Sequence, residues 1–172
     1  LPANSPERKL FKKHLAASYN NIGFLAQNQG KPSWAIVNFG KSLKIQNEIG
    51  DQIGTASSLN NLGVIYQQKG EIPKALALYN ISLKISETLQ DTSAIAYSLN
   101  NLGILLLRQG KLPQALINFE KSLNFRKALN DKEGIATCLN NMALIYNIQG
   151  DEKRAIENFI LANKFHEEIG NQ

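Results

Sequence analysis

Apolar residues recur along the chain at helical spacing, in two kinds of segment that alternate. The first kind places large apolar, small and aromatic residues at i, i+3, i+4 and i+7, as in Leu59, Leu62, Gly63 and Tyr66. The second kind carries its stripe at Ala75, Tyr79 and Ser82. Both patterns have the period of an amphipathic helix. They predict an all-α protein.

The two kinds of segment form a repeat with a period of forty residues. Four blocks align without a gap: SYNNIGFLAQNQG from Ser18, SLNNLGVIYQQKG from Ser58, SLNNLGILLLRQG from Ser98 and CLNNMALIYNIQG from Cys138. A block of the second kind follows each of them, so we expect eight helices in four pairs. The expected repeats cover residues 6–50, 51–90, 91–130 and 131–170 of a single array over residues 1–172. Such a pair cannot bury its apolar face alone, and the pairs are therefore expected to stack.

Residues that favour turns separate the predicted helices. A glycine suited to a left-handed backbone follows the first helix of every repeat, at Gly30, Gly70, Gly110 and Gly150. An aspartate that could cap the next first helix follows three of the second helices, at Asp51, Asp91 and Asp131. Gly50 and Asn130 stand just before two of these aspartates and suit a helix end, whereas Gln90 does not.

The apolar, Leu-Gly and aromatic pattern of Leu59, Leu62, Gly63, Tyr66, Ala75 and Tyr79 resembles the tetratricopeptide repeat family over almost the whole chain. The usual repeat of that family has 34 residues. The forty-residue period is similar to the longer-repeat branch found in kinesin light chains, spindle-orientation scaffolds and bacterial signalling proteins. The resemblance implies a right-handed α-solenoid of four helix pairs. It also implies a non-enzymatic protein-interaction module, the docking or sensory part of a larger signalling or scaffold protein.

In that family, one face of each first helix lines a concave groove in which peptides lie. The candidate groove residues are Asn20, Asn21, Phe24, Asn60, Asn61, Val64, Gln67, Tyr97, Asn100, Asn101, Ile104, Arg108, Asn140, Asn141, Leu144 and Asn147. We expect the first asparagine of each repeat to hold the backbone of an extended peptide, because an amide both donates and accepts hydrogen bonds. The apolar members, Phe24, Val64, Ile104 and Leu144, would contact its side chains. Tyr97 and Arg108 would bias the choice of peptide.

The paired asparagines need a reason, because asparagine within a helix costs about 0.5 kcal/mol relative to alanine. Peptide binding is one reason. The alternative is that one asparagine of each pair ties its helix to the neighbouring repeat, and that duplication copied it. For the second asparagine both interpretations stay open, and for the first we favour the groove.

Other classes of function find less support in the sequence. His14 and His166 lie at opposite ends of the array, and no catalytic motif, metal spacing or cofactor motif is present. Cys138 takes the position of Ser58 and Ser98, which indicates a small packed side chain. A carboxylate clamp of the kind that binds chaperone C-termini is not expected, because one of its five positions matches. Single-stranded RNA is the alternative ligand of another class, but Arg108 is the only basic groove residue, which makes nucleic acid an unfavoured partner.

Charge is distributed unevenly along the chain. Residues 1–50 carry seven Lys or Arg and two Glu, whereas residues 131–172 carry four basic and seven acidic residues. Such a gradient would steer head-to-tail contact between copies, and self-association is therefore a structural alternative. The sequence EIGNQ at residues 168–172 repeats EIGDQ at residues 48–52, so we expect a fragment of a longer protein. No apolar run could cross a membrane, and the single cysteine favours a reducing, cytoplasmic compartment.

Overall fold

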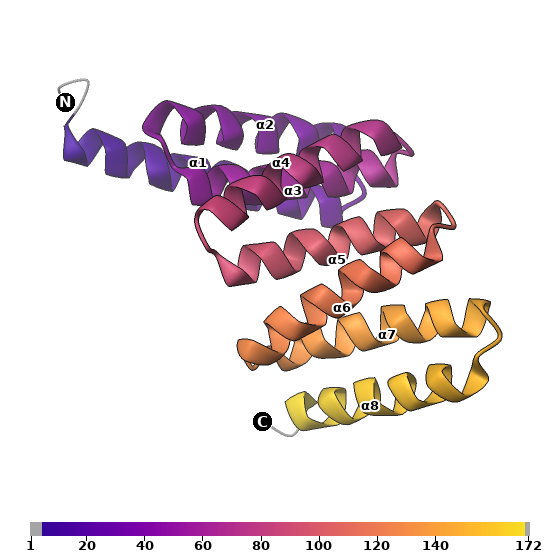
Figure 1. Ribbon diagram of the computed structural model, residues 1–172. Coiled ribbons are helices and arrows are strands. Elements are labelled where there is room, and N and C mark those ends of the chain that lie inside the picture. Colours follow the sequence, from indigo (N-terminus) through magenta and orange to yellow (C-terminus); the bar gives the residue numbers. More distant parts are fainter. Residues whose placement is uncertain (1–4, 171–172) are drawn as a thin grey trace. The chain divides into compact units, whose positions relative to one another are not determined.

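The computed structural model describes residues 5–170, and all the regular structure in that range is helical (Figure 1). Eight helices follow one another: α1 (Pro6–Asn28), α2 (Pro32–Ile49), α3 (Gln52–Gln68), α4 (Ile72–Thr88), α5 (Thr92–Arg108), α6 (Leu112–Ala128), α7 (Lys132–Ile148) and α8 (Glu152–Gly170). The expected all-α class and helix pairing are confirmed in this range. The expected array limits at residues 1 and 172 lie outside it.

The helices form two compact units. Unit 1 comprises residues 1–89 and holds α1 to α4, and unit 2 comprises residues 90–172 and holds α5 to α8. Within unit 1, α1 packs on α2, α3 packs on α4, and α2 also packs on α3. Unit 2 repeats this order, with α6 packed on α7 between the pairs α5–α6 and α7–α8. Each unit is therefore two helix pairs joined through the second helix of the first pair.

The aspartates expected as caps begin the helices. Asp51 accepts a hydrogen bond from the backbone of Gly54 at 3.1 Å, and Asp131 accepts one from Gly134 at 2.9 Å. Asp91 caps α5 in the same way through the backbone of Ala94 at 3.0 Å. Each bond satisfies a backbone N–H that the first turn leaves without a partner, which fixes where the helix starts.

The helix ends also lie where the sequence placed them. Left-handed backbone follows α1, α3, α5 and α7 at glycine, with φ between 68° and 78°. Gln90 and Asn130 adopt the same conformation at φ 54° and 53°, after α4 and α6. Gln90 thus adopts the left-handed conformation at this helix end, although glycine and asparagine are the residues that favour it.

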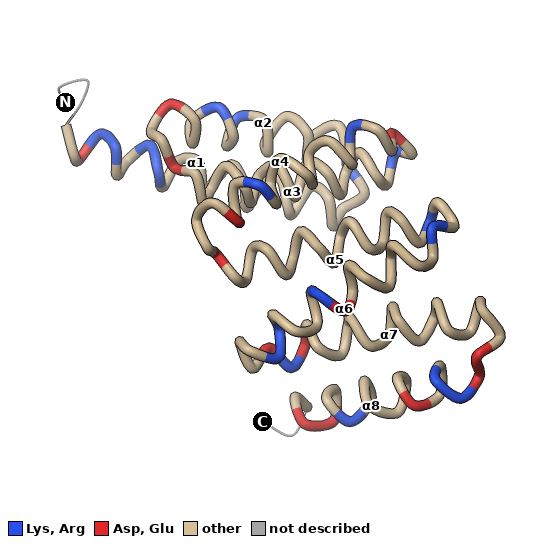
Figure 2. The backbone as a smooth tube through the Cα atoms, in the orientation of Figure 1, with Lys and Arg blue, Asp and Glu red and all other residues tan. Residues whose placement is uncertain are grey.

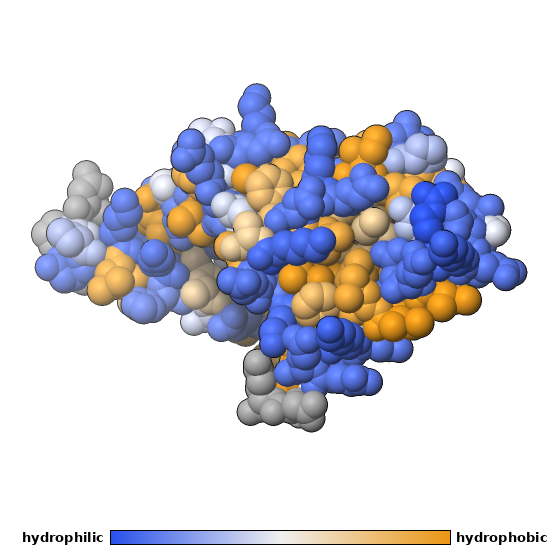
Figure 3. Space-filling view, turned by 60° about the horizontal axis from the view of Figure 1, so that its bottom comes forward, coloured by the Kyte–Doolittle hydropathy of each residue, from blue (hydrophilic) through white to orange (hydrophobic). Residues whose placement is uncertain are grey.

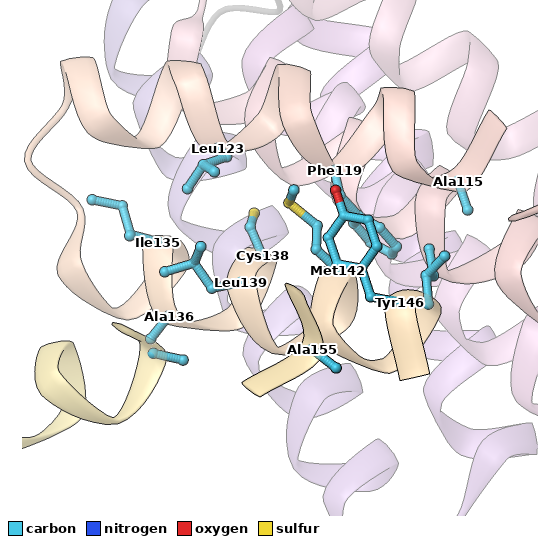
Figure 4. Packing of buried hydrophobic residues seen from close by; sticks show 12 residues of the cluster. Ala115, Phe119, Leu123, Ile135, Ala136, Cys138, Leu139, Met142, Tyr146 and Ala155 are labelled. Atoms are coloured by element: carbon cyan, nitrogen blue, oxygen red, sulfur yellow. The ribbon is translucent and has the colours of Figure 1, made fainter. Parts of the chain in front are cut away.

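Each unit has its own apolar core. In unit 1, Phe39 of α2 packs with Leu62 and Ile65 of α3. In unit 2, Figure 4 shows Cys138 and Met142 of α7 lying beside Leu123 and Phe119 of α6. The second helix of one repeat thus covers the first helix of the next. None of the helices within residues 5–170 combines the length and hydropathy needed to cross a bilayer.

Candidate functional site

In unit 1, the candidate residues of α1 and α3 meet along one seam. The amide nitrogen of Asn61 donates to the side-chain oxygen of Asn20 at 3.1 Å, which joins the second asparagine of one repeat to the first of the repeat before. One helical turn beyond Asn20, the ring of Phe24 is 54% exposed. Asn21 is exposed and Val64 is half-buried. We call Asn20, Asn21, Phe24, Asn61 and Val64 the unit 1 face.

Unit 2 repeats this arrangement on α5 and α7. Asn141 donates to the side-chain oxygen of Asn100 at 3.3 Å. These two residues occupy the same repeat positions as Asn61 and Asn20 in unit 1. Leu144, the counterpart of Phe24 and Val64 in the repeat, is 44% exposed. Asn147 is exposed and Ile104 is half-buried. We call Ile104, Asn140, Asn141, Leu144 and Asn147 the unit 2 face.

The first asparagine of the second repeat does not lie on an open face. The side chain of Asn60 is 2% exposed, and its amide nitrogen donates to the hydroxyl of Ser82 on α4 at 2.7 Å. This corrects the expectation that Asn60 holds a peptide backbone, because a ligand cannot reach a buried amide. Asn100 is buried as well. The first asparagines of the second and third repeats, Asn60 and Asn100, therefore do not fit the preference for the first asparagine as a groove residue.

Gln67 is also used inside its own repeat. Its side-chain oxygen accepts a hydrogen bond from the hydroxyl of Tyr79 at 2.9 Å, and both side chains are buried. The physical reason is the same as for Asn60. A buried polar side chain needs a hydrogen-bond partner, and α4 supplies one to each of these residues of α3: Ser82 to Asn60 and Tyr79 to Gln67.

The structure divides the candidate groove residues into three groups. The exposed group is Asn21, Phe24, Tyr97, Arg108, Leu144 and Asn147. The half-buried group is Asn20, Asn61, Val64, Ile104, Asn140 and Asn141. The buried group is Asn60, Gln67, Asn100 and Asn101. The first two groups can contact a ligand, and the third supports the packing beneath them.

A row of buried serines on the second helices is absent from the sequence-based site. Ser42, Ser82 and Ser122 each donate to a carbonyl of the first helix, at Ala16, Ala56 and Ala96 respectively, and each bond is 2.8 Å long. Their forty-residue spacing on an otherwise apolar stripe is the signal that could have revealed them. These hydroxyls also meet polar groups of other helices, as Ser82 meets Asn60.

Cys138 is part of this packing and not a reactive centre. It is buried, and its thiol lies 3.4 Å from the hydroxyl of Ser122. Burial raises the pKa of the Cys138 thiol, so the thiol stays protonated and is a poor nucleophile. This bears out the small packed side chain expected from the sequence.

Ion pairs lie at the ends of helices and not on the two faces. Lys12 pairs with Glu48 at 2.8 Å, and this hydrogen bond and charge hold the pKa of the Glu48 carboxyl below its usual range. Lys132 of α7 pairs with Glu168 of α8 at 3.1 Å, at the same two repeat positions as Lys12 and Glu48. Within residues 5–170, no three His, Cys, Asp or Glu side chains are grouped closely enough to hold a metal ion. The faces thus offer amides and apolar groups as their main chemistry.

Solved structures with the same fold support this reading of the architecture. BtubC (BKLC) from P. vanneervenii is 22% identical, with a TM-score of 0.80 over 100% of this chain and 68% of that one. The apo form of RapI is 16% identical, with a TM-score of 0.78 over 91% of this chain, which spans only 44% of RapI. A putative kinesin light chain with nearly identical TPR-like repeats from Podosopora anserina is 17% identical, with a TM-score of 0.61 over 100% of this chain and 81% of that one. No curated protein matches the sequence.

The expected fold class, an all-α helical-repeat solenoid, is confirmed by these likenesses together with the helix pairing. The model of the family described as "Tetratricopeptide repeat" matches residues 14–88 and 93–162. Repeats of this kind are typically non-catalytic protein-interaction modules. Because the match covers most of both units, the chain belongs to the tetratricopeptide repeat family.

Proposed function

We propose that the chain is a docking module in which the unit 1 face and the unit 2 face each bind an extended, partly apolar peptide segment. The exposed amides bind the peptide backbone, and the apolar residues between them receive its side chains. The module serves a larger signalling or scaffold protein and performs no catalysis. Its partner is a protein.

The observation that carries the proposal is the exposure of large apolar side chains beside amides. Phe24 and Leu144 occupy the same repeat position, and both reach the surface. Asn21 and Asn147 stand three residues from them and are exposed too. Apolar anchors flanked by adaptable hydrogen-bonding groups are the arrangement that binds a peptide of variable sequence.

Asn20 and Asn61 of the unit 1 face can still hydrogen-bond the backbone of a peptide. Asn20 and Asn61 already share one hydrogen bond, yet an amide has two N–H donors and two acceptor lone pairs. The bond fixes the orientation of Asn61 without using its full capacity. A preoriented amide binds a peptide with a smaller loss of side-chain entropy than a mobile one.

Tyr97 and Arg108 extend the candidate surface along α5. Both are exposed, and Arg108 is the basic member of the candidate set. A peptide with an acidic residue near an aliphatic or aromatic one would use both. Nucleic acid would need several basic side chains to neutralise its phosphates, and neither defined face carries any.

Selection from a library of unstructured peptides displayed on phage tests the proposal, with the purified chain as bait. Phe24→Ala and Leu144→Ala should each weaken the Kd for a selected peptide by at least about tenfold, the effect of an anchor worth about 1.4 kcal/mol. Trp34→Ala in unit 1 and Ile117→Ala in unit 2 are matched controls, because these side chains are also exposed but lie on second helices. They should change the Kd by less than about twofold.

Two results would contradict the proposal. In one, selected peptides bind Phe24→Ala and Leu144→Ala as tightly as they bind the original chain. In the other, the chain selects no peptide but retains single-stranded RNA at physiological salt.

A further inference from the structure

The contact between successive repeats is built twice within the chain, to one pattern. In unit 1, α2 covers α3 by placing Phe39 against Leu62 and Ile65. In unit 2, α6 covers α7 by placing Phe119 in one cluster with Met142 and Ile145, at the same repeat positions (Figure 4). Both rings are fully buried. A ring on a second helix and two apolar residues on a first helix therefore form the two halves of this contact.

One half of the contact is exposed on α1. Forty residues before Leu62 and Ile65 stand Ile22 and Leu25. Leu25 is 57% exposed, whereas Ile65 is fully buried. Ile22 is exposed as well. The sequence has kept the surface that receives a second helix, and nothing in residues 5–170 covers it.

The other half of the contact is exposed on α8. Forty residues after Phe119 stands Phe159, which is 42% exposed. Ile156, the counterpart of Leu116 in α6, is exposed too, although Leu116 packs against the unit 2 core. Phe165 behaves differently from its neighbours, because it packs against the core of its own unit. The exposed apolar side chains of α8 are therefore Ile156, Phe159, Ile160, Leu161 and Ile169, and Phe165 is not among them.

Hydrophobic side chains also reach the surface in the view that brings α8 forward. Figure 3 shows orange side chains lying among hydrophilic ones on that side of the molecule. A surface of this mixed kind is typical of an interface that forms between folded partners.

The two exposed halves carry opposite charge at the ends that would meet. In unit 1, the end of α2 lies beside the start of α3, where the hydroxyl of Thr55 donates to Asn47 at 3.2 Å. In the same register, the end of α8 would lie beside the start of α1. Figure 2 shows basic residues along the first turns of α1 and acidic residues at the end of α8. These residues are Arg8, Lys9, Lys13 and Glu167, together with Lys12 and Glu168, which also form the ion pairs with Glu48 and Lys132 described above.

We propose that copies of this chain associate head to tail, with α8 of one copy packed on α1 of the next in the register of the internal α2–α3 contact. Phe159 of the first copy packs against Ile22 and Leu25 of the second. The acidic end of α8 then lies beside the basic start of α1. The contact is heterologous, so copies add to one another in a row. This proposal is independent of peptide binding, because it uses neither the unit 1 face nor the unit 2 face.

Sedimentation velocity over a concentration series, at low and high salt, tests the association. The weight-average mass should rise above the 19.1 kDa of one chain with concentration, and it should rise less at high salt because screening weakens the charged contact. Phe159→Glu and Leu25→Glu should each remain at 19.1 kDa. Both side chains are exposed in the folded chain, and an unchanged helical circular dichroism spectrum establishes that the variants fold.

Mixing the two variants gives the sharpest readout. Phe159→Glu keeps the α1 half of the contact, and Leu25→Glu keeps the α8 half. An equimolar mixture should therefore form a one-to-one dimer and grow no further. Should either variant fold poorly, Ile156→Lys and Ile22→Lys provide a second pair with the same logic.

Several outcomes would overturn the proposal. A chain that stays monomeric at every concentration and salt would do so. Dimers of Leu25→Glu alone would indicate contact between two α8 helices. Association that survives both charged variants but is lost in Phe24→Ala would place the contact on the unit 1 face.

Discussion

In three of the repeats, an aromatic ring of the second helix lies against a glycine of the first helix. The three pairs are Gly23 with Phe39, Gly63 with Tyr79 and Gly103 with Phe119. A Cβ on Gly63 would lie 2.5 Å from a ring carbon of Tyr79, closer than any van der Waals contact. The ring cannot withdraw easily, because it is buried and its hydroxyl donates to Gln67.

Gly63→Ala should therefore destabilise unit 1 through overpacking, which typically costs about 1–3 kcal/mol. Gly40→Ala is the matched control, because Gly40 lies within α2 and a Cβ there would meet nothing within 4 Å. The control should gain up to about 1 kcal/mol of helix propensity, and the difference between the two variants isolates the steric cost. Urea unfolding followed by circular dichroism measures both. Equal free energies of unfolding for the two variants would contradict the close approach.

The residue scale is also where prediction from sequence is weakest. Glycine, alanine and aromatic positions follow from the period, because close packing admits few residue types there. An amide, in contrast, is compatible with a ligand, a neighbouring repeat or a second helix. Asn60 donates to the hydroxyl of Ser82, whereas Asn61 donates to the side chain of Asn20. The two asparagines are neighbours in one NN pair, and that pattern does not distinguish their partners. Which partner lies within hydrogen-bonding distance depends on the orientation of the helices, and periodicity alone does not determine that orientation.

At the scale of the helix, a hydrogen bond from a serine side chain to the backbone joins the two members of three pairs, α1–α2, α3–α4 and α5–α6. Ser82 donates to the carbonyl of Ala56, a backbone group that already belongs to α3. The fourth repeat has Ala162 at the corresponding position, and that side chain is fully buried. The packing of a helix pair thus tolerates loss of the hydroxyl when the site is closed by a methyl group.

Ser82→Ala should lower the free energy of unfolding of unit 1 by about 1–3 kcal/mol, because it leaves the buried amide of Asn60 without this acceptor. Ser57→Ala, at an exposed site of α3, should change it by less than about 0.5 kcal/mol. Thermal and urea unfolding of the two variants make the comparison. A cost for Ser82→Ala no larger than that for Ser57→Ala would show that the hydroxyl is dispensable.

Helix boundaries were the part of the fold that the sequence predicted best. Aspartate before a helix and glycine after it act within one turn, so their effect is local and readable without the tertiary structure. Asp51 and Asp131 confirm this at the start of α3 and α7. Gln90 shows the limit, because the turn after α4 forms in left-handed backbone despite lacking glycine.

At the scale of the whole molecule, each unit has an apolar core among its own described residues. One gathers around Phe39 in unit 1 and the other around Phe119 in unit 2. Stability in repeat proteins is a sum of local terms, and different parts of such a chain can open at different free energies.

The single cysteine of the sequence allows the opening of unit 2 to be measured by itself. Cys138 lies in the unit 2 core beside Met142 (Figure 4). Burial raises its pKa and shields the thiol, so a thiol reagent reacts only when unit 2 opens. The rate of labelling at fixed pH therefore reports the population of the open form of that unit when opening and closing are fast.

Phe119→Leu and Phe39→Leu form a matched pair, because both rings are fully buried and stand at the same repeat position. Each should cost about 1–2 kcal/mol, part of the loss that truncating a buried Phe entails. Phe119→Leu should accelerate labelling of Cys138 about 5- to 30-fold, the change in open population that such a cost produces. Phe39→Leu should leave the labelling rate within about twofold, because it weakens the other core. Equal acceleration by the two variants would mean instead that α1 to α8 open as one cooperative unit.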